Sequence, residues 1–115
     1  MYNYNDLVDK TVLVTGASGD IGHAICGKFL EQGCVVYALY CTNKAQLIEL
    51  QKHHPAGTKL HLLQGDLSNQ EDVSAICAQL SRDKGKLDVL VNNAGIVKDS
   101  LFAAMSFDDF SSVIN

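Results

Sequence analysis

The chain has 115 residues, a length that a single compact domain accounts for. Hydrophobic residues make up 47% of it and charged residues 19%, a balance that excludes an intrinsically disordered protein. The net charge of −4 and the scattered basic residues argue against partners such as nucleic acid or an anionic membrane, and no apolar stretch is long enough to span a bilayer.

Four short apolar runs predict β-strands, at Thr11–Thr15, Val35–Tyr40, Leu60–Gln64 and Leu87–Asn92. Most of them are apolar throughout rather than alternating, which is typical of strands buried on both faces of a parallel sheet. The third run is the least strand-like, because it lacks a β-branched residue and contains His61.

Helical patterns separate these strands. In the first helix, Ile21, Ala24, Ile25 and Phe29 share one face. The second runs from about Asn43 to His53, where Pro55 and Gly57 follow.

The third helix is predicted to open with a capping box, in which Ser68 is followed by Glu71. Its apolar residues keep helical spacing, at Val73, Ile76, Cys77 and Leu80. Ser106 and Asp109 offer a weaker box for a fourth helix. The order of elements predicts an α/β fold, a doubly wound parallel sheet with helices on both faces in three α-β-α layers.

Three glycines, Gly16, Gly19 and Gly22, lie where the first strand gives way to the first helix. Such a turn aims unpaired N–H groups of the helix at the end of the sheet, which creates an anion site. The first glycine allows a sharp turn, the second a close approach of pyrophosphate, and the third tight packing of helix on strand. Alternatively, the glycines only solve a packing problem.

Two more segments follow later strands at the edge of the sheet where ligands bind in such folds. Asp66, in "GDL", could accept a hydrogen bond from an adenine amine, or could simply be an acid favoured near a helix start. In "NNAG", Asn92–Gly95, two adjacent amides close a buried strand, and the small residues after them leave room for a ligand. We favour a binding role for this second segment.

The chain resembles the short-chain dehydrogenases/reductases, in the motifs "TGASGDIG", "GDL" and "DVLVNNAG". Its C-terminal stretch, Asn92–Asn115, looks most like the 3-oxoacyl-[acyl-carrier-protein] reductases, although acetoacetyl-CoA and polyketide reductases look similar there. The resemblance implies a Rossmann-type fold and hydride transfer between NAD(P)H and a carbonyl. The Gly16–Ile21 backbone would hold the pyrophosphate, Asp66 and Leu67 would flank the adenine, and Asn93–Gly95 would lie along the ribose toward the nicotinamide.

One residue departs from the family pattern. Single-domain members usually read T-G-x-x-x-G-x-G, whereas here Asp20 occupies the place of the middle glycine and Gly19 precedes it. An acid suits a helix N-terminus but would repel pyrophosphate if it turned inward, so we expect its side chain to point to solvent. Asn92 is expected to brace the sheet rather than touch the cofactor.

The end of the second strand favours NADP(H), with NAD(H) as the alternative. NAD-specific sites place an acid there, but Val35–Lys44 contains none, and Tyr40 stands in its place. Cys41 and Thr42 offer donors nearby, whereas Lys44 is equally well explained as a solvated residue. The predicted cofactor-binding residues are therefore Gly16, Ala17, Ser18, Gly19, Asp20, Ile21, Gly22, Cys41, Thr42, Asp66, Leu67, Asn93, Ala94 and Gly95.

No catalytic residue is predicted in this chain. The family uses a helical Tyr-x-x-x-Lys pair and a strand serine beyond the fourth strand; the spacing of Tyr40 and Lys44 matches, but their place on the second strand is wrong. We therefore interpret residues 1–115 as the dinucleotide-binding half of one Rossmann domain without its catalytic half, unstable alone. The parent would have roughly 240–260 residues.

The cysteines and histidines carry no predicted metal site, because neither has metal-ligand spacing. We interpret the cysteines as neutral thiols of a reducing compartment, and the N-terminus lacks a signal-peptide layout, which favours a cytoplasmic location.

The leading functional prediction is NADP(H)-dependent reduction of a 3-oxoacyl thioester by an oligomeric parent. Lys98 and Asp99 could border a docking surface for an acyl carrier protein or merely form a solvated turn. The alternatives are a reductase or dehydrogenase of another small carbonyl or alcohol, and a non-catalytic dinucleotide sensor.

Overall fold

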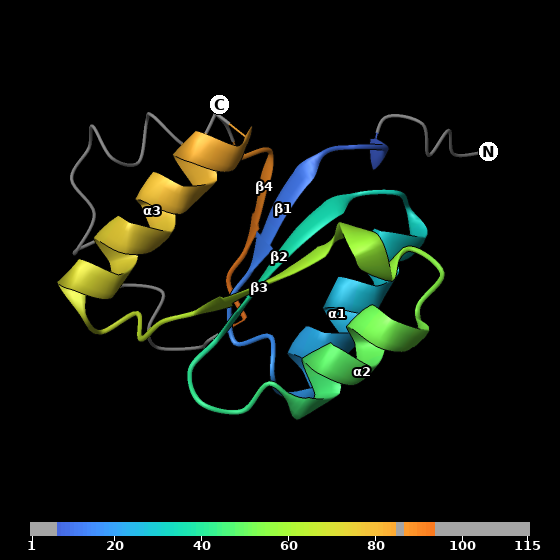
Figure 1. Ribbon diagram of the computed structural model, residues 1–115, viewed down its shortest axis with the longest axis horizontal. Coiled ribbons are helices and arrows are strands. Elements are labelled where there is room, and N and C mark those ends of the chain that lie inside the picture. The colour runs from blue at the N-terminus through green and yellow to red at the C-terminus, as the bar shows by residue number, and fades with distance from the viewer. Residues whose placement is uncertain (1–6, 85–86, 94–115) are drawn as a thin grey trace.

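The computed structural model describes residues 7–84 and 87–93, with side chains except at position 84 (Figure 1). Its strands are β1 (Thr11–Val14), β2 (Val35–Tyr40), β3 (Leu60–Gln64) and β4 (Val89–Val91). Its helices are α1 (Asp20–Glu31), α2 (Ala45–His53) and α3 (Gln70–Lys84), and a short 3-10 helix, η2 (Gly57–Lys59), precedes β3. The predicted fourth helix, with Ser106 and Asp109, lies outside the described residues, as do Ala94, Gly95, Lys98 and Asp99.

The four strands form one parallel sheet in the order β3-β2-β1-β4. Helices α1 and α2 cover one face of the sheet and α3 covers the other, which gives three layers (Figure 1). The predicted doubly wound α/β fold is confirmed. All strands therefore end at the same edge of the sheet, the edge where ligands bind in folds of this kind.

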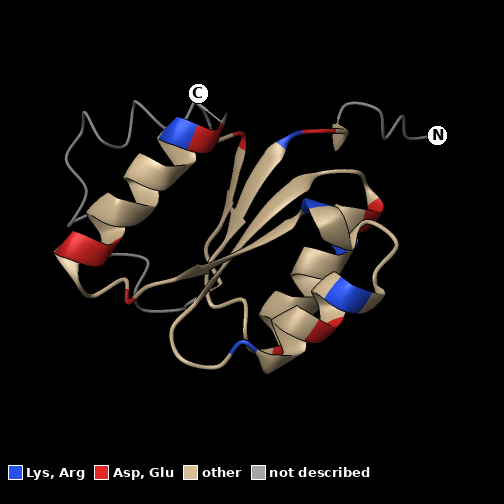
Figure 2. Ribbon diagram, viewed as in Figure 1, with Lys and Arg blue, Asp and Glu red and all other residues tan. Residues whose placement is uncertain are grey.

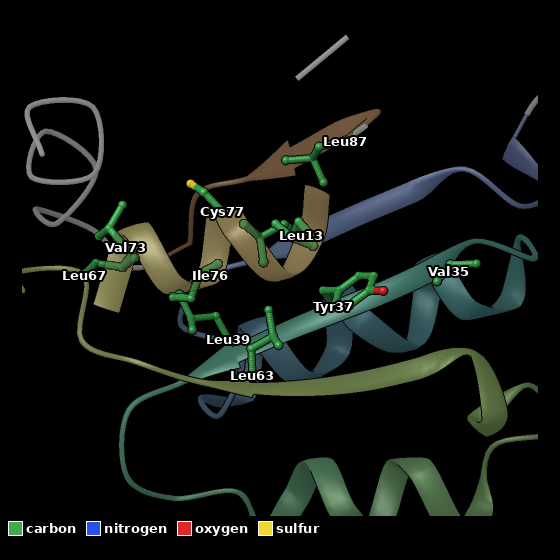
Figure 3. Close-up of a cluster of buried hydrophobic side chains, with 11 residues drawn as sticks. Leu13, Val35, Tyr37, Leu39, Leu63, Leu67, Val73, Ile76, Cys77 and Leu87 are labelled. Atoms are coloured by element: carbon green, nitrogen blue, oxygen red, sulfur yellow. The ribbon is translucent and has the colours of Figure 1, made fainter. Parts of the chain in front are cut away.

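Two hydrophobic cores lie on the two faces of the sheet, because alternate residues of each strand point to opposite sides. On β2, Tyr37 and Leu39 face α3, whereas Val36 and Ala38 face α1 and α2. Figure 3 shows the α3 core, where Ile76 lies against strand residues Leu39 and Leu63. The predicted apolar face of α3 is confirmed, since all four of its residues are buried in this core.

Continuous burial holds for β1 and β2 but not for the two strands at the edges of the described sheet. Every residue of β1 and β2 is buried. In β3, His61 and Gln64 are exposed, and His61 stacks its ring on Tyr37 with 4.9 Å between centroids. The three residues of β4 are half-buried, and the strand is shorter than the predicted run.

The predicted face of α1 is only partly buried, because Ile25 and Phe29 pack against the core whereas Ile21 and Ala24 are exposed. Gly22, Cys26 and Leu30 pack into the core, whereas Ile21 is 69% exposed. The reason is that α1 approaches the sheet closely at Gly22, a residue that contributes no apolar signal to the sequence pattern. All four predicted residues also line a shallow groove of about 510 Å3 on the outer flank, together with Asp20 and Lys28.

The predicted capping box of α3 is wrong by one residue. The side chain of Asn69, not Ser68, caps the helix, because its Oδ1 accepts a hydrogen bond from the backbone N–H of Asp72 at 3.0 Å. Ser68 instead donates to Asp66, through both its N–H and its hydroxyl. Glu71 is exposed.

Charged residues lie on the helices and loops and not on the four strands (Figure 2). Cys26, Cys34 and Cys77 are buried, Cys41 is exposed, and none of the four is in a disulfide bond. Burial raises the pKa of the Cys26 thiol to about 12, so this group stays neutral. Within residues 7–84 and 87–93, no helix could cross a membrane, and no three histidine, cysteine or acidic side chains gather as metal ligands.

Candidate functional site

The turn between β1 and α1 lies at the carboxyl edge of the sheet. Gly16 adopts a positive φ of 60°, a conformation that is nearly free of steric cost only for glycine. The N–H of Ala17 donates to the Leu39 carbonyl at 3.0 Å, which ties the turn to β2. The chain therefore leaves β1 sharply and enters α1 in a fixed position.

The third glycine of the motif is required by packing. A β-carbon at Gly22 would overlap the carbonyl oxygen of Gly16, and would also lie 2.8 Å from the Ala17 Cα and 3.0 Å from the Asn93 Nδ2. Any side chain at position 22 must therefore push α1 away from the turn. This close approach holds the start of α1 against the ends of β1 and β4.

The first turn of α1 has no side-chain cap. Gly19 is the N-cap and has no side chain, so the N–H groups at the helix start stay available to an anion. Asp20 is exposed, as predicted, and its Oδ1 accepts a hydrogen bond from the Gln46 side chain at 3.3 Å. The carboxylate thus lies toward α2.

Polar side chains connect the ends of β1 and β4. The Thr15 hydroxyl oxygen accepts from the Asn93 N–H at 3.0 Å, and the Asn93 side-chain amide donates to the Gly16 carbonyl at 3.2 Å. Asn92 lies in the same cluster, with its Oδ1 3.3 Å from the Thr15 hydroxyl. Its buried Nδ2 has no hydrogen-bond partner among the described residues. Both asparagines thus contact the sheet and the glycine turn.

A pocket of about 240 Å3 opens beside this turn, between the ends of β2 and β3. Five of its lining residues belong to the predicted set, and they are Gly16, Ser18, Cys41, Asp66 and Leu67. The sequence reasoning did not include Leu39, Tyr40 and Gly65, which also line it. Tyr40 ends its strand and Gly65 begins "GDL", so strand-end position alone could have identified both.

The other described members of the predicted set do not line this pocket. Ala17 is fully buried beneath the turn, and Gly22 is buried against it. Gly19 and Thr42 are exposed, and the side chains of Asp20 and Ile21 border the groove on the outer flank of α1. Gly19, Asp20 and Ile21 could offer a ligand their backbone at the start of α1.

Asp66 is held as an exposed anion at the rim of the pocket. Its Oδ1 accepts from the Ser68 N–H at 2.9 Å and from the Ser68 hydroxyl at 2.7 Å. These hydrogen bonds lower the pKa of the Asp66 carboxyl, because they stabilise its charged form. Asp66 can therefore act as a hydrogen-bond acceptor at neutral pH.

The end of β2 presents no acid to the pocket. Cys41 is exposed, and its carbonyl accepts from the Gln64 side chain at 3.1 Å, which joins the ends of β2 and β3. Lys44 is exposed just before α2, while Tyr40 is largely buried at the end of its strand. Tyr40 therefore lies at the end of a strand and Lys44 in the loop that follows. They do not lie on one helix, as the Tyr-x-x-x-Lys pair of the family does.

The model of the short chain dehydrogenase family matches residues 10–115. The chain belongs to this family. Solved short-chain dehydrogenases share the fold: the aldohexose dehydrogenase of Thermoplasma acidophilum superposes with a TM-score of 0.65 at 34% sequence identity, over 82% of this chain and 32% of that one.

Curated relatives of this short-chain dehydrogenase chain include nodulation protein G of Azospirillum brasilense, 39% identical over 91% of this chain and 43% of the relative. The 3-oxoacyl-[acyl-carrier-protein] reductase FabG of Chlamydia trachomatis is 37% identical over 95% of this chain and 44% of that protein. The chain thus spans less than half the length of the curated relatives it matches.

Proposed function

We propose that the whole protein is an NADP(H)-dependent short-chain reductase that converts a 3-oxoacyl thioester to the 3-hydroxyacyl thioester. Residues 1–115 would form its dinucleotide-binding half and contribute no catalytic residue. The pocket beside the glycine turn is the observation that carries the proposal. The bound cofactor would supply the hydride, and the described residues would bind and orient it.

The residues present fit a dinucleotide. The uncapped start of α1 offers backbone N–H groups to a pyrophosphate, and Gly19 leaves the approach free of a side chain. Next to it, the pocket is walled by apolar Leu39 and Leu67 and rimmed by the Asp66 carboxylate. This combination suits a flat adenine with an exocyclic amine, as proposed for Asp66 and Leu67.

The choice of NADP(H) over NAD(H) is supported by the end of β2. A carboxylate there would bind the ribose hydroxyls of NAD(H) and repel the 2′-phosphate of NADP(H). Tyr40 and Cys41 line the pocket at this point, and neither has a carboxylate side chain. Thr42 adds an exposed hydroxyl at the same place.

The thioester substrate is supported by similarity to the 3-oxoacyl-[acyl-carrier-protein] reductase. A reductase or dehydrogenase of another small carbonyl or alcohol is the second candidate, favoured by the similarity to an aldohexose dehydrogenase. A non-catalytic dinucleotide sensor is the third. An acyl carrier protein as partner, a homo-oligomeric state and a cytoplasmic location remain predictions for the whole protein.

Purified full-length protein tests these candidates. We expect NADPH to bind more tightly than NADH, and acetoacetyl thioesters to drive NADPH oxidation faster than sugar or steroid ketones. Binding of NADPH with oxidation only by other ketones would support the second candidate. Binding without turnover on any ketone would support the sensor. Failure to bind either dinucleotide would overturn the proposal.

A further inference from the structure

Asp72, in the first turn of α3, does not line the pocket but is hydrogen-bonded to a residue that does. Its Oδ2 accepts a hydrogen bond from the backbone N–H of Asp66 at 2.9 Å. Asp66 lines the pocket together with its two neighbours, Gly65 and Leu67. The hydrogen bond therefore joins this wall of the pocket directly to the helix.

Asp72 is itself fixed by the helix start. Its N–H donates to the Asn69 side chain at 3.0 Å, and the next residue, Val73, donates its N–H to the Asn69 carbonyl at 3.1 Å. The Val73 side chain is buried in the α3 core, where Leu67 also packs. The acceptor that holds Asp66 is thus anchored by a helix cap and by the core.

The wall of the pocket packs closely against α3. A β-carbon at Gly65 would lie 2.9 Å from the Ile76 Cδ1 and 3.5 Å from the Asp72 Cβ. This packing limits movement of the wall toward α3, and the hydrogen bond from Asp66 to Asp72 opposes movement away from it. Ser68 orients the Asp66 carboxylate locally, but only Asp72 ties the Asp66 N–H to the helix.

We propose that Asp72 is a positioning residue for the adenosine half of the dinucleotide, acting through the Asp66 N–H to hold the Gly65–Leu67 wall in place. This inference rests on the proposed dinucleotide-binding function. Asp72 does not line the pocket, so it acts on the ligand only through Asp66. The acceptor oxygen, rather than the negative charge, is the property that matters.

The test uses full-length protein and two displacement probes against bound NADPH. 5′-AMP would occupy the adenosine pocket, whereas inorganic pyrophosphate would occupy the start of α1 without reaching Asp66. Asp72→Ala removes the acceptor, Asp72→Asn keeps one, and Glu71→Ala removes an exposed acid from the same turn as a matched control. Asp72→Ser, too short to reach Asp66, replaces the alanine variant if that variant does not fold.

We expect Asp72→Ala to weaken 5′-AMP by up to about tenfold, the usual effect of losing one hydrogen bond. Pyrophosphate affinity should stay unchanged, and Asp72→Asn and Glu71→Ala should both bind 5′-AMP as the wild type does. Unchanged 5′-AMP affinity in Asp72→Ala, equal loss of both probes, or no rescue by asparagine would each overturn the inference. If the wild type binds no dinucleotide, the proposed function itself fails.

Discussion

Gly22 of α1 packs against the carbonyl oxygen of Gly16 so closely that a β-carbon at position 22 would overlap it. Both residues belong to the same glycine motif, yet of the two only Gly16 has a positive φ. Position 22 thus requires glycine because there is no room for a side chain, and position 16 favours glycine because its φ is positive.

Gly22→Ala should destabilise the protein by about 1–3 kcal/mol, the usual cost of overpacking a core. The added methyl group must push α1 off the ends of β1 and β4. Denaturant unfolding followed by circular dichroism measures the effect. An unchanged unfolding midpoint would contradict the packing described for this glycine.

Gly19→Ala is the counterpart that separates folding from binding. A β-carbon there would meet only the Gly16 carbonyl oxygen, at an ordinary 3.8 Å, so the unfolding midpoint should fall less than in Gly22→Ala, by no more than the cost of alanine at an N-cap. The methyl group would still face the approach to the start of α1, and we expect NADPH affinity to fall. If NADPH bound as tightly as to the wild type, the pyrophosphate would have to lie elsewhere.

Thr15→Val should destabilise the protein by about 1–3 kcal/mol, because it leaves buried polar groups without their partner. The Thr15 hydroxyl contacts both Asn92 and Asn93. Thr11→Val is the matched control, since Thr11 is also buried but lies at the start of β1, the end opposite to the two asparagines. If urea unfolding gave the same loss of unfolding free energy for both variants, the contacts of Thr15 with Asn92 and Asn93 would not contribute to stability.

Cys41→Asp should shift cofactor preference toward NADH. The new carboxylate would line the pocket and repel a 2′-phosphate, so NADPH affinity should fall at least about tenfold while NADH affinity changes little. Cys41→Ser controls for loss of the thiol. Equal weakening of both dinucleotides in fluorescence titrations would show that the 2′-phosphate does not reach this position.

Thiol labelling should separate Cys41 from the other cysteines. At pH 8, iodoacetamide should modify the exposed Cys41, whereas Cys26 is buried and its pKa is raised to about 12. Peptide mapping by mass spectrometry locates the label, and labelling in denaturant should reach all four thiols. NADPH should slow modification of Cys41, and labelling at an undiminished rate would place the cofactor away from this wall.

Tyr37 should make stability depend on pH above 10. Its hydroxyl donates to Asp83 at 3.2 Å, and burial, followed by the Asp83 charge, raises its pKa from 10.0 to about 12. The folded state therefore holds this proton more tightly than the unfolded chain does. The resulting stability is fully present below pH 10 and is lost as the pH rises toward 12.

Tyr37→Phe tests this directly. The variant should lose the hydrogen bond at neutral pH, yet its free energy of unfolding should fall less steeply than that of the wild type between pH 10 and pH 12. Urea titrations at several pH values measure both slopes. If the free energy of unfolding of Tyr37→Phe and of the wild type fell equally steeply with pH, Tyr37 would not be the source of this pH dependence.

The fold was predictable because its signals are local. Apolar runs and helical spacing located all four described strands and three described helices, and the glycine motif located the turn. The start of α3 was misplaced because Ser68 and Asn69 are both good capping residues, and only the path of the backbone decides between them. The buried face of α1 was misjudged because Gly22 packs through its lack of a side chain.

The candidate site was predictable only in part, because its partners lie far apart in the sequence. Thr15 meets Asn92 and Asn93 across 77 and 78 positions, and no local pattern shows which hydroxyl an amide will find. The same holds for Asp72, whose contact with Asp66 depends on how closely α3 packs on Gly65. Motifs identified the strand ends, and tertiary packing decided which atoms meet.

The two outermost described strands, β3 and β4, differ in how well each suits pairing with a further strand. At β3 the exposed His61 and Gln64 make the rim polar, which discourages a further strand from pairing there. At β4 every residue is aliphatic and half-buried, with Val89 and Val91 on one face and Leu90 on the other. A further strand would therefore pair more favourably with β4 than with β3. Its side chains would bury Leu90 more deeply on one face of the sheet and Val89 and Val91 on the other.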